Sequence, residues 1–158
     1  MTVVVIGSGD EYLRLTAVEW PGEPETPRLF LQAELRVPGE SPVEGVSAAR
    51  VVIPHAGDVE TLVGFFDEVA ERWRDLEPDE RPVWRSFLRE VEVEARRVRP
   101  AGSPQHRGPD YVALLVTLRD VRAWESARWI VTATLSVQPA GQLHDIATDV
   151  HALAGALG

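Results

Sequence analysis

The stretch DVETLVGFFDEVAERWRDL, from Asp58 to Leu76, is the part of this chain whose pattern defines its fold class. Its apolar residues recur at helical spacing and form one stripe, with charged residues on the opposite side. That stripe consists of Leu62, Phe65, Phe66, Val69, Ala70 and Trp73. Asp58 is suited to be the N-cap, and Glu60 places negative charge in the first turn. A helix with so rich a stripe is expected to pack on a sheet.

Alternating apolar and polar residues predict the strands of that sheet on both sides of the helix. Before the helix, we expect a hairpin that turns at Gly7 to Asp10, followed by strands over residues 28–37 and 46–54. After it, residues 83–98, 110–119 and 128–137 predict a three-stranded meander, with 83–98 as one long strand. Residues 141–157 predict a second helix with one apolar face. The expected fold class is therefore α+β.

The order of these elements predicts their arrangement. Loops too short to hold crossover helices favour an antiparallel sheet, and two helices with one apolar face each favour packing on the same face of that sheet. We expect one domain over residues 1–158, with element order ββββαβββα and a mostly antiparallel sheet of about seven strands. No internal repeat or second domain is visible in the sequence.

The composition excludes several classes of function. The chain has 158 residues and no cysteine, so disulfides, thiolate metal sites and thiol nucleophiles are excluded. All 16 basic residues are arginine, which excludes lysine chemistry. The formal charge of −9 argues against binding to nucleic acid or anionic lipid and favours a basic partner. With no signal peptide and no apolar run of about 18 residues, we expect a cytoplasmic protein without a membrane segment.

The charge is distributed unevenly along the chain. Residues 58–80 carry nine acids and two arginines, a net of −7, whereas residues 81–107 carry seven arginines and three glutamates, a net of +4. One interpretation is that the two adjoining stretches neutralise each other across the fold. The other is that they form separate charged surfaces.

No cofactor or metal site is predicted. The start VVVIGSG resembles a dinucleotide-binding strand, but the third glycine of that fingerprint is replaced by Tyr12. His144 and His151 lie about two helical turns apart, roughly 10 Å along the helix, which is too far to chelate one ion. No serine stands in a G-x-S-x-G motif. The sequence therefore contains no catalytic signature.

Two sets of residues are candidates for contact with a partner. The first is a charged outer sheet face with two tryptophans of uncertain environment as anchors. Its members are Glu34, Arg36, Glu90, Glu92, Glu94, Trp20 and Trp124. The alternative for the glutamates is a solvated face that discourages edge aggregation. The alternative for the tryptophans is packing in the core.

The second set is an arginine cluster at the hairpin that follows residue 98. Arg97, Arg99 and Arg107 lie there, next to Arg96 and His106. Guanidinium groups bind phosphate or carboxylate in a bidentate manner, so these residues are candidates for an anion site. No aromatic residues are interleaved for base stacking, which argues against nucleic acid. The alternative is a soluble hairpin tip.

Three segments resemble those of a known group of proteins. They are the run from Phe65 to Trp73, Trp84 with its alternating strand, and the ending from Leu135 to Leu143. Together they look like a group of small actinobacterial proteins of unknown function, which distantly resembles immunity proteins of contact-dependent bacterial toxin systems. The likeness covers roughly residues 28–157 and consists of packing motifs, so it implies a fold and a binding role but no catalytic residue.

The expected function is therefore that of a non-enzymatic protein-binding domain, an immunity-type protein that binds a basic protein partner. The alternative is a small-ligand-binding module with a pocket between sheet and helices. A third hypothesis is an enzyme that uses Glu90, Glu92 or the histidines.

Overall fold

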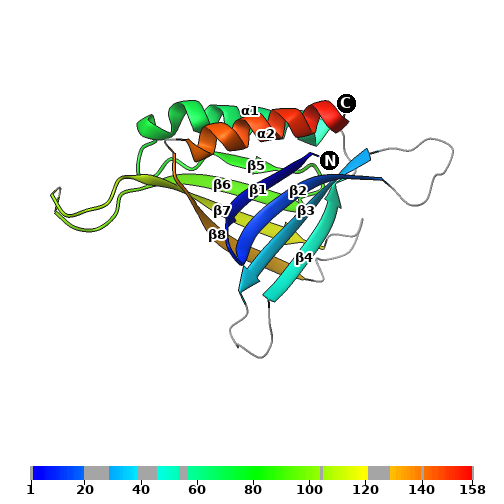
Figure 1. Cartoon of the computed structure of the whole chain (residues 1–158), viewed down its shortest axis with the longest axis horizontal. Coiled ribbons are helices and arrows are strands. Elements are labelled where there is room, and N and C mark those ends of the chain that lie inside the picture. Colours follow the sequence, from blue (N-terminus) through cyan, green and yellow to red (C-terminus); the bar gives the residue numbers. More distant parts are fainter. Residues whose placement is uncertain are drawn as a thin grey trace.

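The structure is a computed structural model that describes residues 2–19, 29–38, 46–53, 57–103, 105–120, 129–139 and 141–157. The described residues form eight strands, two α-helices and a short 3₁₀ helix (Figure 1). In chain order the elements are β1 (Val3–Ser8), β2 (Glu11–Glu19), β3 (Leu29–Pro38), β4 (Val46–Ile53), α1 (Gly57–Arg72), η1 (Trp73–Asp75), β5 (Val83–Arg85), β6 (Val91–Val98), β7 (Tyr111–Arg119), β8 (Ile130–Val137) and α2 (Gln142–Leu157).

The strands form two antiparallel sheets of four strands each, in the orders β1-β2-β3-β4 and β5-β6-β7-β8. The expected α+β class is confirmed, whereas the expected single sheet of about seven strands is wrong. Each sheet consists of strands consecutive in the sequence, and each is followed by one α-helix. The described chain thus repeats the order of four strands and a helix, a regularity that the sequence does not display.

Residues 83–98 were expected to form one strand, but they fold back as the hairpin of β5 and β6. The turn is closed by bonds from the Ser86 amide to the Val91 carbonyl (3.0 Å) and from the Arg89 amide to the Ser86 carbonyl (2.9 Å). Arg89 adopts a φ of 63°, a left-handed conformation more usual for glycine or asparagine. The turn has no Gly, Pro, Asn or Asp, so the sequence lacks the usual turn signal.

Both predicted helices are present, and they lie side by side on one side of the molecule (Figure 1). The buried residues of α1 include Leu62, Phe65, Phe66 and Val69, which confirms the predicted stripe. The helix ends at Arg72 and continues as η1, where the sequence suggested one helix to Leu76. Helix α2 lies mainly against β1, β2 and β3, whereas α1 lies mainly against β5, so the expectation that both helices pack on one face of a single sheet is wrong. No helix in the described ranges is long and apolar enough to cross a membrane.

One hydrophobic core joins both sheets and both helices. Phe66 is fully buried and meets Phe65 edge to face, with ring centroids 5.2 Å apart. Strand β7 is buried on both faces for most of its length, since Ala113 and Thr117 are buried as well as the apolar residues that alternate with them. The residues of β7 that were predicted to face inward, namely Val112, Leu114, Val116 and Leu118, are all buried.

The first hairpin turns where the sequence predicts. Ser8 pairs with Glu11, so Gly9 and Asp10 form a two-residue connection between β1 and β2. Gly7 has a φ of 118°, and a Cβ at this position would lie 2.4 Å from the Glu11 carbonyl oxygen. Glycine is therefore required at position 7 by both conformation and space.

Candidate functional site

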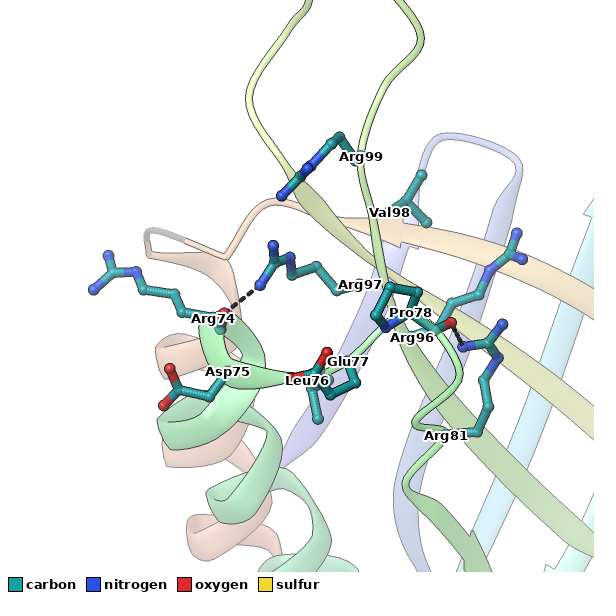
Figure 2. Close-up of a pocket in the computed structure, with 10 residues that line it drawn as sticks. All are labelled: Arg74, Asp75, Leu76, Glu77, Pro78, Arg81, Arg96, Arg97, Val98 and Arg99. Atoms are coloured by element: carbon teal, nitrogen blue, oxygen red, sulfur yellow. Dashed lines mark hydrogen bonds between the residues drawn. The ribbon is translucent and has the colours of Figure 1, made fainter. Parts of the chain in front are cut away.

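An open cleft lies between the segment that follows α1 and the end of β6. It has a volume of about 730 Å³ and is lined by residues 74–78 and Arg81 on one side and by residues 96–99 on the other. Five of these residues are arginines, namely Arg74, Arg81, Arg96, Arg97 and Arg99. Figure 2 shows their side chains around the cleft. We call this site the arginine cleft.

Several of the five guanidinium groups are held in place by the protein. Arg97 donates from Nη1 to the carbonyl oxygen of Arg74, which ties β6 to η1 across the cleft (Figure 2). Arg81 donates from Nη1 to the Pro78 carbonyl oxygen at 2.6 Å. Arg74 stacks over the ring of Trp73, with 5.2 Å between the guanidinium carbon and the ring centroid. These contacts fix positions without neutralising charge.

The arginine cleft has more arginines than carboxylates. Its lining contains two acids, Asp75 and Glu77, against five arginines, a formal charge of +3, which falls to +1 when the ion-pair partners Glu94 and Asp110 are included. Asp110 is shared by two arginines, with Oδ2 at 3.3 Å from Arg97 Nε and 3.9 Å from Arg99 Nε. Within the described residues, Arg96 has no ion pair. The arginine cleft is therefore a positive site on an acidic protein.

The structure places only part of the predicted anion site in this cleft. Arg97 and Arg99 line it, as does Arg96, but Arg107 does not. Arg107 lies in the β6–β7 connection, next to Gly102. Arg74 and Arg81 were missed because they are about 15 to 25 residues away in sequence. Arg74 joins the others through the packing of η1 on β6, and Arg81 through the pairing of β5 and Pro82 with β6.

The predicted charged partner face does not exist as one surface. Glu34 and Arg36 lie on β3 in the first sheet, whereas Glu92 and Glu94 lie on β6 in the second sheet. The expectation that they share a face is therefore wrong, because it depended on a single sheet. Arg36 donates to the Tyr12 hydroxyl at 3.4 Å.

Glu34 is buried between two arginines from neighbouring strands. It pairs with Arg14 on β2 and Arg50 on β4, which stand directly opposite it in the strand register. Arg14 Nη2 donates to Glu34 Oε1 at 2.6 Å, and Arg50 Nε donates to Oε2. Burial favours a higher pKa for Glu34, but the hydrogen bonds and charges of Arg50 and Arg14 outweigh it and lower the pKa below its usual value. The carboxylate is thus engaged within its own sheet.

The glutamates around β6 are engaged as well. Glu92 lies 3.0 Å from Arg85 Nε and 3.6 Å from Arg119 Nη1, and Glu94 lies 3.6 Å from Arg81 Nε. Glu90 precedes β6, is only 6% exposed, and accepts a hydrogen bond of 2.5 Å from the Ser86 hydroxyl. The prediction that Glu90 belongs to an open outer face is wrong.

The two tryptophans proposed as anchors, Trp20 and Trp124, lie outside the residues that the structure describes. Trp84 is buried and donates from Nε1 to the Thr61 hydroxyl at 2.9 Å, which joins β5 to α1. An open hollow of about 690 Å³ lies beside this contact, between α1 and β5. Phe65 and Trp84 contribute aromatic surface to its lining.

The helices carry an acidic outer surface, which we call the helical layer. Its exposed acids are Glu60, Asp67, Glu68, Glu71, Asp75, Asp145 and Asp149. His151 on α2 reaches Asp67 on α1, with Nε2 2.8 Å from Oδ2. Within the described ranges, no three His, Asp or Glu side chains gather closely enough to hold a metal ion.

Comparison with known proteins identifies a family but no function. No curated protein matches the chain, and no solved structure matches it. A family model described as "Family of unknown function (DUF6228)" matches residues 34–156, which include part of β3, both helices and both sides of the arginine cleft. This match covers well over half of the sequence, and the chain therefore belongs to this family of unknown function.

Proposed function

We propose that this chain is a non-enzymatic binding protein and that the arginine cleft receives an anionic group of its ligand. The observation that carries this proposal is the gathering of five guanidinium groups along one cleft of a chain with formal charge −9. Like charges held close together cost folding free energy, and an anionic ligand relieves that cost. Guanidinium groups suit the purpose because they bind phosphate and carboxylate oxygens in a bidentate manner.

Calorimetric titration with inorganic phosphate and tripolyphosphate tests the proposal at low ionic strength, where charge interactions are least screened. The informative variant is R96Q/R99Q. Arg96 has no ion pair within the described residues, and Arg99 has only the distant carboxylate of Asp110. Each charged hydrogen bond contributes about 1.5–3 kcal/mol, so the double variant should bind at least about tenfold more weakly.

The matched control is R89Q/R107Q, which removes the same charge from arginines outside the cleft. Its affinity should stay within about twofold of the parent protein, because screening weakens remote charges. Equal loss in both double variants would show a general charge effect, and absence of binding by the parent protein would refute the proposal.

The second candidate is binding of a basic protein partner by the helical layer. Seven exposed acids against Arg72 and Arg74 give this layer a formal charge of −5. Opposite charge accelerates encounter with a cationic protein. The resemblance to immunity proteins supports the same candidate. The sheet glutamates Glu34, Glu92 and Glu94 are left out of this surface because each is paired with an arginine and less than one third exposed. Glu68 of the helical layer also pairs with an arginine, Arg72, but it is about half exposed.

Capture from native lysate tests this candidate with two matched variants. E60Q/E71Q removes two exposed acids from α1, whereas D10N/E19Q removes two exposed acids from the β1–β2 hairpin. A basic partner should be recovered with the parent chain and with D10N/E19Q, but much less with E60Q/E71Q. Equal recovery with both variants would rule out the helical layer as the contact surface.

A further inference from the structure

We propose that the occupant of the arginine cleft is an extended acidic peptide segment of a partner protein, which pairs with the uncovered edge of β6. This inference rests on the proposed anion-binding function and specifies its ligand. Strand β6 has eight residues, whereas its neighbour β5 has three and pairs only with Glu92 to Glu94. The end of β6 therefore continues past β5 without a neighbour from that strand.

The backbone of Arg97 points toward this uncovered side. The Val91 carbonyl accepts from Ser86 and the Ala95 amide donates to Pro82, so the odd-numbered residues of β6 direct their backbone groups toward β5. Arg97 follows the same alternation one step further along. Among the described strands, none lies beside Arg97 on that side. Its N–H and C=O are positioned to pair with an added strand.

The space beside this edge is the arginine cleft itself, since residues 96–99 form one of its walls. Its volume of about 730 Å³ falls within the usual range for ligand pockets, roughly 300–1,000 Å³. The opposite wall comes from residues 74–78 and Arg81. We place the extended peptide between the two walls, beside the hydrogen bond from Arg97 to the Arg74 carbonyl that crosses the cleft.

The distribution of the arginines favours a linear ligand over a single small ion. The guanidinium groups of Arg74, Arg96 and Arg99 point in different directions around the rim (Figure 2). Arg96 lies on the sheet face of Glu92 and Glu94, and Arg97 lies on the other face, because alternate residues of a strand point to opposite sides. A peptide with several carboxylates can reach groups on both faces, whereas one phosphate can reach only some of them.

The test uses an acetylated and amidated hexapeptide of alternating glutamate and valine. Two further probes are the same peptide with methylated internal backbone amides and the same peptide with glutamine in place of glutamate. Tripolyphosphate is the fourth probe. Binding of each to the ¹⁵N-labelled full chain is followed by NMR, together with hydrogen exchange of the Arg97 amide.

The expected result is that the acidic peptide binds, slows exchange of the Arg97 amide at least tenfold, and binds at least tenfold more weakly when its amides are methylated. The glutamine peptide and the R96Q/R99Q variant should each show a similar loss, whereas R89Q/R107Q should not. Equal binding of the methylated and unmethylated peptides, or an unchanged Arg97 amide, would overturn the strand pairing.

The four probes separate this inference from the proposed function. Binding of tripolyphosphate without the acidic peptide would leave anion binding intact and overturn the peptide ligand. Binding of the glutamine peptide as tightly as the acidic one would overturn the role of charge. If neither tripolyphosphate nor the acidic peptide binds, the proposed function and this inference are overturned together. Dimerisation that protects the Arg97 amide without any peptide would identify a second copy of the chain as the occupant and overturn the acidic peptide.

Discussion

The carboxylate of Asp58 accepts the backbone N–H of Phe87, with both of its oxygens 3.0 Å from that nitrogen. Asp58 is 6% exposed and lies in the first turn of α1, so this contact fastens the helix to the β5–β6 turn. The sequence suggested an N-cap at Asp58, but the helix begins at Gly57, and the side chain serves a turn 29 residues away.

Replacement of Asp58 by alanine should lower the free energy of unfolding by about 2 kcal/mol, because a buried amide loses a charged acceptor. Urea denaturation measures this value. Glu60→Gln is the control, since Glu60 is an exposed acid of the same turn, and its effect should stay within about 0.5 kcal/mol. Equal effects of the two variants would mean that Asp58 acts only through the charge of the helix end.

Ser86→Ala should destabilise the β5–β6 turn. The Ser86 hydroxyl donates to Glu90 Oε2 at 2.5 Å and accepts from the Val91 amide at 3.1 Å, and both contacts are buried. Its removal leaves two buried polar groups short of a partner, which costs about 1–3 kcal/mol. Thermal unfolding checks this value, with the exposed Ser136→Ala on β8 as the control. A stability of Ser86→Ala equal to that of Ser136→Ala would contradict the role of this hydroxyl.

Glu34 should make the stability of the protein depend on pH in the acidic range. Since the arginines lower its pKa in the folded state, the unfolded chain takes up the proton first. Glu34 therefore contributes to the stability of the folded state above its usual pKa of 4.5. This contribution is lost as the pH falls through the lower pKa that Glu34 has in the folded state. Below that value, protonated Glu34 no longer favours the folded state.

Glu34→Gln should thus be less stable than the parent protein at neutral pH, and the difference should shrink under acid. Urea denaturation over a pH series measures both curves. Glu19→Gln serves as the control, because Glu19 is an exposed acid at the end of β2. This variant should show the same decrease of the free energy of unfolding at acidic pH as the parent protein. If the free energies of unfolding of Glu34→Gln and the parent protein differed by the same amount at every pH, the lowered pKa of Glu34 would make no contribution to stability.

Neighbouring residues of β1 should differ sharply in their tolerance of truncation. Ile6 is fully buried in the shared core, whereas Val5 is 50% exposed on the other face of the strand. Ile6→Ala should cost about 2–5 kcal/mol, because it leaves a cavity in close-packed surroundings. Val5→Ala should cost less than about 1 kcal/mol. Comparable losses would mean that β1 does not contribute an inward face to the core.

Local patterns predicted which side of each element is apolar. The stripe through Leu62 and Phe66, the alternation in β3 and β6, and the turn at Gly9 all follow the sequence, because helical and strand periodicities are set by backbone geometry. The same patterns failed at residues 86–90. There the turn depends on the side chains of Ser86 and Asp58 and on the left-handed Arg89. A single serine without Gly, Pro, Asn or Asp beside it is a weak turn signal in sequence.

The sequence by itself determined the two helices and most of the strands. It also excluded reactions that need cysteine or lysine. Only the tertiary structure shows that the strands divide into two sheets and that Glu34 is buried and paired with arginines. It also shows that Arg74 and Arg81 meet the arginines of β6 and Arg99 in one cleft. Periodicity encodes the faces of single elements. The pairing of sheets and the meeting of distant side chains depend on contacts between residues far apart in the chain, which only the packed core brings together.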